Sequence, residues 1–154
     1  MIITDEALLR VECSDLLPEE IGPLKDQLER ELARSGELGR PGIGLAAPQI
    51  GIHKNMAIVR IGNLSIDLVN CEIGEKYDLS IFDGEGCLSF PDRRERTRRF
   101  QEIVVTKNAV GPNRFVATGL LAVCIQHEID HTKGVLLPDV LVDSVNDRKL
   151  RGRT

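Results

Sequence analysis

Two histidines spaced four residues apart are the first residues in this sequence that could do chemistry. His127-Glu128-Ile129-Asp130-His131 is an H-E-x-x-H sequence, and on a helix this spacing places both imidazoles on one face, one turn apart. The two side chains can therefore share a metal ion, with Glu128 at their flank as general base for a water in the open coordination position. The alternative is a pair of solvated or core histidines, because a lone H-E-x-x-H also occurs by accident.

A catalytic tetrahedral site usually has three protein ligands and leaves one position for water, so the pair needs a third ligand. The residues alone leave four candidates: Cys87, Cys124, His53 and a carboxylate. Cys124 lies three residues before His127 on the same helical face, and we expect it to be a wall residue beside the metal rather than a ligand. His53 has no partner motif and is interpreted as a surface histidine.

The helix that must carry the two histidines is the clearest secondary-structure signal. Thr118 suits the N-cap and Gly134 suits a left-handed position after the helix. Between them, the residues that recur at three- and four-residue spacing are Leu120, Val123, Cys124, His127 and His131.

The remaining elements are read from shorter patterns. A helix is predicted over residues 18–34, where leucines recur at four-residue spacing and Gly36 offers a C-terminal stop. Residues 56–73 instead show two short β-like runs separated by a hairpin-like turn at Gly62-Asn63, and a further strand is predicted over residues 102–107. This order predicts an α+β fold in which antiparallel β-sheets wrap around a central helix that carries the H-E-x-x-H motif.

Length and composition indicate an ordinary globular chain. The 154 residues are 42% hydrophobic and 29% charged, which fits one domain over residues 1–154. The formal charge of −4 argues against DNA as a partner. No stretch approaches the roughly 20 apolar residues that span a bilayer, and the acidic N-terminus is unlike a signal peptide. We therefore expect a cytoplasmic protein with no membrane partner, whose four cysteines stay reduced and can bind metal.

Three separate segments give the chain its resemblance to the peptide deformylase family. They are Gly-Ile-Gly-Leu-Ala-Ala-Pro-Gln at residues 42–49, Glu-Gly-Cys-Leu-Ser at residues 85–89 and Gln-His-Glu-Ile-Asp-His at residues 126–131. The resemblance implies that Cys87 is the third metal ligand beside His127 and His131. It also implies hydrolysis of the N-formyl group from the formylmethionine that begins new polypeptides, with release of formate. One divalent ion is implied, natively Fe(II), with Zn(II), Ni(II) or Co(II) possible in purified material.

The resemblance also assigns roles around the metal. A metal-activated water attacks the formyl carbon, and Glu128 accepts its proton and then protonates the departing amine. The Gln49 side-chain amide and the backbone N–H of Leu88 stabilise the oxyanion. Without the other motifs, Gln49 would be interpreted as a loop residue that caps local backbone.

On the substrate side, the family binds an extended peptide in the manner of an added strand. The residues that the resemblance assigns to substrate binding are Ile43, Gly44, Gly86, Arg94, Leu120, Val123 and Cys124. Simple core packing is an alternative for the apolar ones, and for Leu120 and Val123 the two interpretations are compatible. The partners expected are N-formylmethionyl nascent peptides, with a transient ribosome contact, and we expect a monomer.

Five arginines lie within residues 93–99, and a solvated charged loop is the default interpretation. The family register aligns Arg94 with an arginine that contacts the peptide backbone, and Arg99 with one that braces the site through acidic groups such as Asp130. The arginines at 93, 96 and 98 have no such counterpart and are candidates for contact with ribosomal RNA.

Some features depart from the family pattern. Asp83 lies where an apolar pocket residue is common, so we expect an altered or more open methionine pocket. The 20 residues after Gly134 are fewer than in many bacterial members, which argues against ribosome docking through a longer C-terminal helix, and the basic tail at 148–153 is interpreted as a frayed terminus.

Two rival functions remain open. A zinc endopeptidase with the same motif would recruit a Glu or His in place of Cys87 as the third ligand. A structural metal protein, or an inactive relative that only binds formylated peptides, would not depend on Glu128 for turnover.

Overall fold

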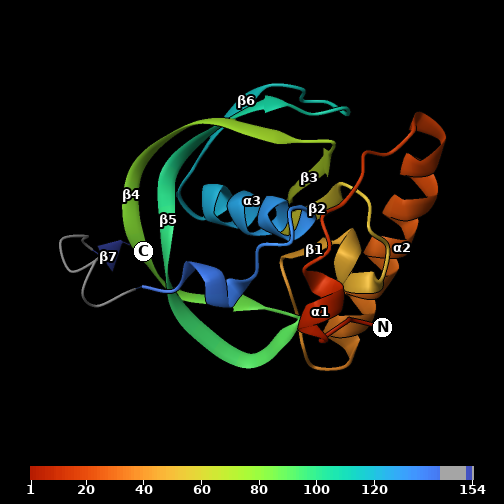
Figure 1. The fold of residues 1–154 in the computed structure, drawn as a ribbon, viewed down its shortest axis with the longest axis horizontal. Helices are drawn as coiled ribbons and strands as arrows, with labels where there is room; N and C mark the ends of the chain where they lie inside the picture. The colour runs from red at the N-terminus through yellow and green to blue at the C-terminus, as the bar shows by residue number, and fades with distance from the viewer. Residues whose placement is uncertain (143–151, 154) are drawn as a thin grey trace.

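The computed structural model describes residues 1–142 and 152–153, and helix α3 (Gly119–Thr132) lies at its centre (Figure 1). Every residue of α3 from 122 to 129 is buried, so the helix is covered on all sides in this stretch. A helix buried all round needs cover from more than one layer. Two β-sheets provide that cover, which confirms the predicted α+β class with sheets around a central helix.

The first sheet has the strand order β1-β2-β3 and is antiparallel throughout. Its strands are β1 (Gly44–Ala46), β2 (Met56–Ile61) and β3 (Leu64–Val69). Ile61 pairs with Leu64 across a two-residue turn in which Gly62 has a φ of 56°, so the predicted hairpin is confirmed.

The second sheet has the order β6-β5-β4-β7 and curves around α3 on the side opposite the first sheet (Figure 1). Its strands are β4 (Glu72–Cys87), β5 (Phe90–Lys107), β6 (Phe115–Thr118) and β7 (Gly152–Arg153). β7 alone runs parallel to its neighbour, pairing with Ile81 and Phe82 of β4. The expectation of a frayed tail is therefore wrong for residues 152–153, while residues 148–151 lie outside the described part of the chain.

The helices outside the centre are α1 (Glu6–Leu9), α2 (Pro18–Glu37) and two 3-10 turns, η1 (Ala47–Ile50) and η2 (Leu137–Val140). The prediction of α2 is confirmed except at its end. The helix continues through Gly36, and Gly39, with a φ of 81°, takes the left-handed position after it. In α3, by contrast, Thr118 is the N-cap and Gly134 has a φ of 73°, as predicted.

β5 differs from the predicted strand over residues 102–107, because it begins at Phe90. The arginine run lies inside this strand and is not a loop. Thr97 and Arg99 alternate inward and are buried, while Arg94 and Arg96 are exposed. Hydrophobic periodicity does not predict this strand, because the charged side chain of Arg99 occupies one of the inward positions.

The core lies between α3 and the two sheets. Ile125 and Ile129 of α3 pack in one cluster with Val59 of β2 and with Ile103 and Val105 of β5. A second cluster joins leucines of α2 to the other face of the first sheet. Within the described ranges, no helix has both the length and the hydropathy to cross a membrane.

Replacing Ile125 by Ala should lower the free energy of unfolding by about 2–5 kcal/mol, because the side chain is fully buried where α3 meets both sheets. Urea unfolding of the metal-loaded protein measures this. The matched control is Leu38→Ala, whose side chain is 71% exposed and whose loss should change the free energy by about 0.5 kcal/mol or less. Equal effects of the two substitutions would contradict the position of α3 in the core.

Candidate metal centre

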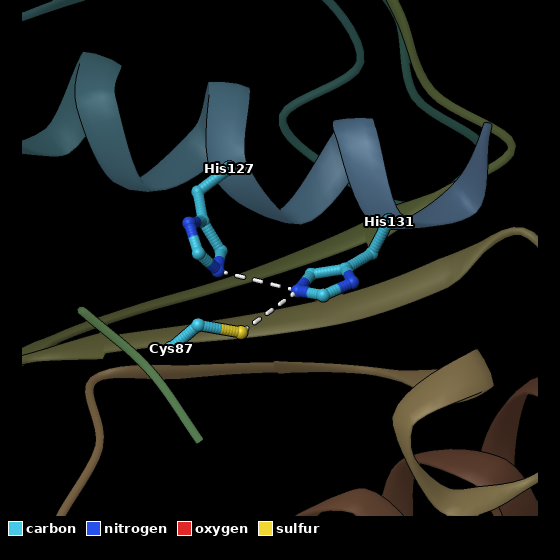
Figure 2. A group of neighbouring side chains, drawn as sticks. All are labelled: Cys87, His127 and His131. Carbon is cyan, nitrogen blue, oxygen red and sulfur yellow. Dashed lines mark hydrogen bonds between the residues drawn. The ribbon is translucent and has the colours of Figure 1, made fainter. Parts of the chain in front are cut away.

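Three donor atoms converge on the side of α3 that faces the end of β4 (Figure 2). The Nε2 atoms of His127 and His131 are 3.2 Å apart, and Cys87 Sγ lies 3.3 Å from His131 Nε2. All three donor atoms lie within 4.8 Å of one another. Figure 2 shows the two imidazoles descending from successive turns of α3 toward Cys87, which arrives from another part of the chain.

The chemistry of this donor set fits a divalent metal ion. A thiolate and two imidazoles are ligands that first-row transition metals accept, and three ligands leave a position for water. Burial lowers the pKa of His131 well below its ordinary value, which keeps its imidazole neutral and able to donate a lone pair. The cluster does not include Cys124 or His53. The Nε2 atom of His53 instead lies 2.9 Å from the Leu8 carbonyl oxygen.

A residue without a predicted role, Glu85, orients the site. Its Oε2 lies 2.7 Å from His127 Nδ1, and Arg99 donates to both of its oxygens, at 2.8 Å from Nε and 2.6 Å from Nη2. Thr97 adds a hydroxyl donor at 2.7 Å. The third side of the arginine is held by Asp130 Oδ2 at 2.6 Å from Nη1, so the predicted bracing contact of Arg99 is present.

Ionisation of Glu85 fixes the tautomer of His127. Burial alone would raise the pKa of Glu85, but the hydrogen bonds from Arg99 and His127 outweigh it and hold the pKa far below its ordinary value. An ionised carboxylate can only accept, so Nδ1 of His127 carries a proton and Nε2 is left to face the metal position. The only clue in the sequence was position, because Glu85 lies two residues before Cys87 within the same motif.

Glu128 is the buried carboxylate beside the donor cluster. Its side chain is 4% exposed, and burial raises its pKa to about 7. Within the described part of the chain, Oε1 has no hydrogen-bond partner although it is fully buried. Such an atom is an acceptor held ready for a ligand or a water.

Gly44 leaves the room that Glu128 occupies. A Cβ atom at Gly44 would lie 2.4 Å from Glu128 Oε2 and 3.1 Å from the Ile58 carbonyl oxygen, so the Glu128 carboxylate would have to move to make room for it. The glycine-rich segment therefore passes against the carboxylate by its bare backbone.

Gln49 is held so that its amide nitrogen faces the cluster. Its Oε1 accepts from the backbone N–H of Ala46 at 3.0 Å, which fixes the amide orientation. Its Nε2 then donates to Ser89 Oγ at 3.0 Å and lies 3.6 Å from Cys87 Sγ. Gln49 thus caps local backbone, as expected of a loop residue, through its contact with Ala46. It also directs its Nε2 donor toward the Cys87, His127 and His131 cluster. Ser89, its partner, had not been assigned a role.

A cavity of about 490 Å³ opens beside the metal centre. Its wall includes Gln49, Leu88, His127 and Glu128, together with Cys87. All residues assigned to substrate binding line it too: Ile43, Gly44, Gly86, Arg94, Leu120, Val123 and Cys124. Burial raises the pKa of the Cys124 thiol to about 12, as expected of a wall residue that stays protonated.

Asp83 does not line this cavity, so its carboxylate does not enter the pocket. The register shifts between Asp83 and Glu85, where Gly84 is the extra residue of a β-bulge with a φ of 88°. In a regular strand, Asp83 and Glu85 would point to the same face. The bulge changes the phase, which leaves Asp83 exposed and turns Glu85 into the core.

Two imidazoles one helical turn apart, a thiolate and a buried carboxylate beside a cavity are together the parts of a mononuclear metal-dependent hydrolase. The family model described as polypeptide deformylase matches residues 2–147. The chain therefore belongs to the polypeptide deformylase family.

Individual relatives agree with the family model. A peptide deformylase of Acetivibrio thermocellus is 32% identical over 152 residues, which cover 97% of this chain and 86% of the relative. One of Heliobacterium modesticaldum is 48% identical over 100 residues, which cover 64% of this chain and 66% of the relative. The crystal structure of the Thermotoga maritima peptide deformylase superposes with a TM-score of 0.80 at 31% identity, covering 93% of this chain and 97% of that one. Members of the family remove the N-formyl group from nascent polypeptides with a single metal ion.

Replacing Glu85 by Gln should weaken metal binding by about 10- to 100-fold, because the neutral amide no longer fixes the His127 tautomer. Competition with a chromogenic chelator measures the affinity. Glu95→Gln is the matched control, since Glu95 pairs with Glu85 across the sheet but bonds only to Arg93 among the described residues. Metal affinity that stays the same in Glu85→Gln would show that Glu85 does not orient the ligand.

Proposed function

We propose that this chain hydrolyses the N-formyl group of formylmethionyl polypeptides at the Cys87, His127 and His131 centre. One observation carries the proposal: a buried carboxylate, Glu128, has an unpartnered oxygen beside a Cys-His-His cluster at the wall of a cavity. A structural metal site would be closed by a fourth ligand and would not need such a group. An endopeptidase with this motif would not use Cys87, which contributes one of the three donor atoms here.

Each residue of the centre has a defined task. When bound, the divalent ion supplies Lewis acidity and lowers the pKa of water at its open position. Glu128 accepts the proton from the attacking water through Oε1 and later delivers it to the departing amine nitrogen. A pKa near 7 suits a group that must both take and give a proton at neutral pH.

Donors for the developing negative charge come from two segments. Gln49 Nε2, oriented by Ala46 and Ser89, is the side-chain donor of the proposed oxyanion site. The backbone N–H of Leu88, in the turn directly after Cys87, is the second donor. Because both are fixed before the reaction, they stabilise charge without reorganising.

The peptide is proposed to lie extended along the segment that contains Gly44, with its methionine side chain in the cavity. Ile43, Leu120, Val123 and Cys124 form the apolar wall, and Gly44 and Gly86 allow close approach of the peptide backbone. Arg94, at the mouth, is proposed to contact that backbone.

The finer assignments belong to the same proposal. The native ion is proposed to be Fe(II), with Zn(II), Ni(II) or Co(II) replacing it after purification, because thiolate-bound iron is easily lost by oxidation. We also propose a cytoplasmic monomer in which residues 1–154 form one catalytic domain. A transient ribosome contact is proposed for the outer face of β5, where Arg96 is exposed.

The chain loaded anaerobically with Fe(II) or Ni(II) should release formate from formyl-Met-Ala-Ser and should leave acetyl-Met-Ala-Ser intact. Glu128→Gln should lower kcat by about 10²- to 10⁴-fold while the metal content stays unchanged, because only proton transfer is removed. Glu19→Gln, an exposed carboxylate of α2, is the matched control. Full turnover by Glu128→Gln, or no formate from the loaded wild type, would contradict the proposed function.

Gly44→Ala should lower kcat/KM by about 100-fold, because its methyl group displaces Glu128 from its position and even a small misplacement of a catalytic group costs about this much. Metal content should be retained. Gly36→Ala is the matched control, since a Cβ there meets nothing within 4 Å. The prediction fails if steady-state kinetics of the two variants are alike.

A further inference from the structure

The mouth of the cavity carries positive charge although the chain as a whole has a formal charge of −4. Three arginines line it, Arg40, Arg93 and Arg94, and we call them the arginine rim. Arg40 and Arg94 are exposed, and neither forms an ion pair with any residue in the described ranges. Among the described residues that line the cavity, Asp92 is the one exposed acid.

A large irregular bulge in the pairing of β4 with β5 places two of these arginines beside the cavity. Glu85 pairs with Glu95 and Cys87 pairs with Phe90, so the single residue Gly86 on β4 stands opposite residues 91–94 on β5. Bulges of this kind re-aim side chains beside active sites. A Cβ atom at Gly86 would lie 2.5 Å from Arg94 Nη1, so the guanidinium rests directly on the residue before the metal ligand.

Arg93 is held in place by its neighbours. Its Nε donates to Glu95 Oε1 at 3.1 Å, and its guanidinium carbon lies 5.5 Å from the centroid of the Phe90 ring. The hydrogen bond to Glu95 uses one edge of the guanidinium. A side chain positioned in advance loses less conformational freedom when a ligand binds to it.

Arg40 lines the cavity from a different part of the chain, the segment that leads into β1. It precedes Gly44, which touches Glu128, by four residues, a separation of roughly 14 Å at most for an extended chain. The segment that carries it meets the turn after β4, since a Cβ atom at Gly42 would lie 2.8 Å from Leu88 Cδ1. A peptide of three extended residues is roughly 10 Å long. Its second and third residues are therefore long enough to reach the arginine rim.

We propose that Arg40 and Arg93 select formylmethionyl chains that carry an acidic side chain at one of the two positions after the methionine. This inference rests on the proposed function and names its substrate class. The deeper acids do not cancel the rim, because Glu85 is buried and paired with Arg99, and Glu128 is 4% exposed. A carboxylate at the mouth can pair with the Arg40 guanidinium and with the edge of the Arg93 guanidinium that Glu95 leaves open, whereas a lysine side chain is repelled.

The test compares kcat/KM for formyl-Met-Glu-Ala, formyl-Met-Ala-Glu, formyl-Met-Ala-Ala and their lysine counterparts, all with amidated C-termini so that no other carboxylate is present. The better glutamate peptide should exceed the alanine peptide by about three- to tenfold, as expected of one or two exposed ion pairs. The lysine peptides should fall below the alanine peptide. The preference should shrink in about 0.5 M salt, where exposed charges are screened.

Charge-reversal variants test whether the arginine rim causes the preference for acidic peptides. Arg40→Glu and Arg93→Glu should each reduce the ratio of glutamate to lysine peptide, and the double variant should invert it. Arg30→Glu is the matched control, because it makes the same change of net charge on an exposed position of α2 that does not line the cavity. It should leave the ratio unchanged.

The outcomes separate this inference from the proposed function. Equal kcat/KM for acidic, neutral and basic peptides would overturn the selectivity while leaving deformylation intact. A preference for acidic peptides that survives the double variant, or a double variant that changes only ribosome binding, would also overturn it. Failure to turn over the neutral peptide would instead overturn the proposed function.

Discussion

The site depends on one buried charge cluster in which Arg99 lies between Glu85 and Asp130. Arg99 is 4% exposed and Glu85 is 5% exposed, so neither charge is solvated by bulk water. Burying an unpaired charge is prohibitively costly, and such a pair is tolerated only when good geometry and further hydrogen bonds satisfy it. Here the partners come from β4, β5 and α3, so the cluster fixes the position of the second sheet relative to the helix that carries His127 and His131.

That constraint reaches the metal position through His127. The same Oε2 of Glu85 that accepts from Arg99 also lies against His127 Nδ1, so the orientation of one imidazole is tied to the sheet. His131 has no comparable support, because its Nδ1 is buried without a hydrogen-bond partner among the described residues. The two histidines of the motif are therefore unequal: one is held by charge, and the other by the packing of α3.

Local patterns predicted what local interactions determine. The four-residue spacing of His127 and His131 predicted their common face, and alternation around Gly62 predicted the β2–β3 hairpin. The role of Glu85 and the full length of β5 were missed, because both depend on a contact between residues 14 positions apart, Glu85 and Arg99. A charge that is neutralised by a distant partner looks in the sequence like a charge that faces solvent. The arginine run by itself therefore indicated a solvated loop, and only the family register assigned Arg99 to a bracing contact with Asp130.

Two bulges between β4 and β5 position two groups of charged residues, one buried beside the metal centre and one at the mouth of the cavity. The two groups should tolerate substitution differently. The bulge at Gly84 turns Glu85 into the charge cluster, and the bulge opposite Gly86 carries Arg93 to the mouth of the cavity. A change of charge in the first group leaves a buried partner unsatisfied and disturbs the orientation of His127. A change in the second group alters an exposed side chain that the cluster does not contact. The chemistry can therefore stay fixed while the charge of the mouth, and with it the preferred substrate, varies.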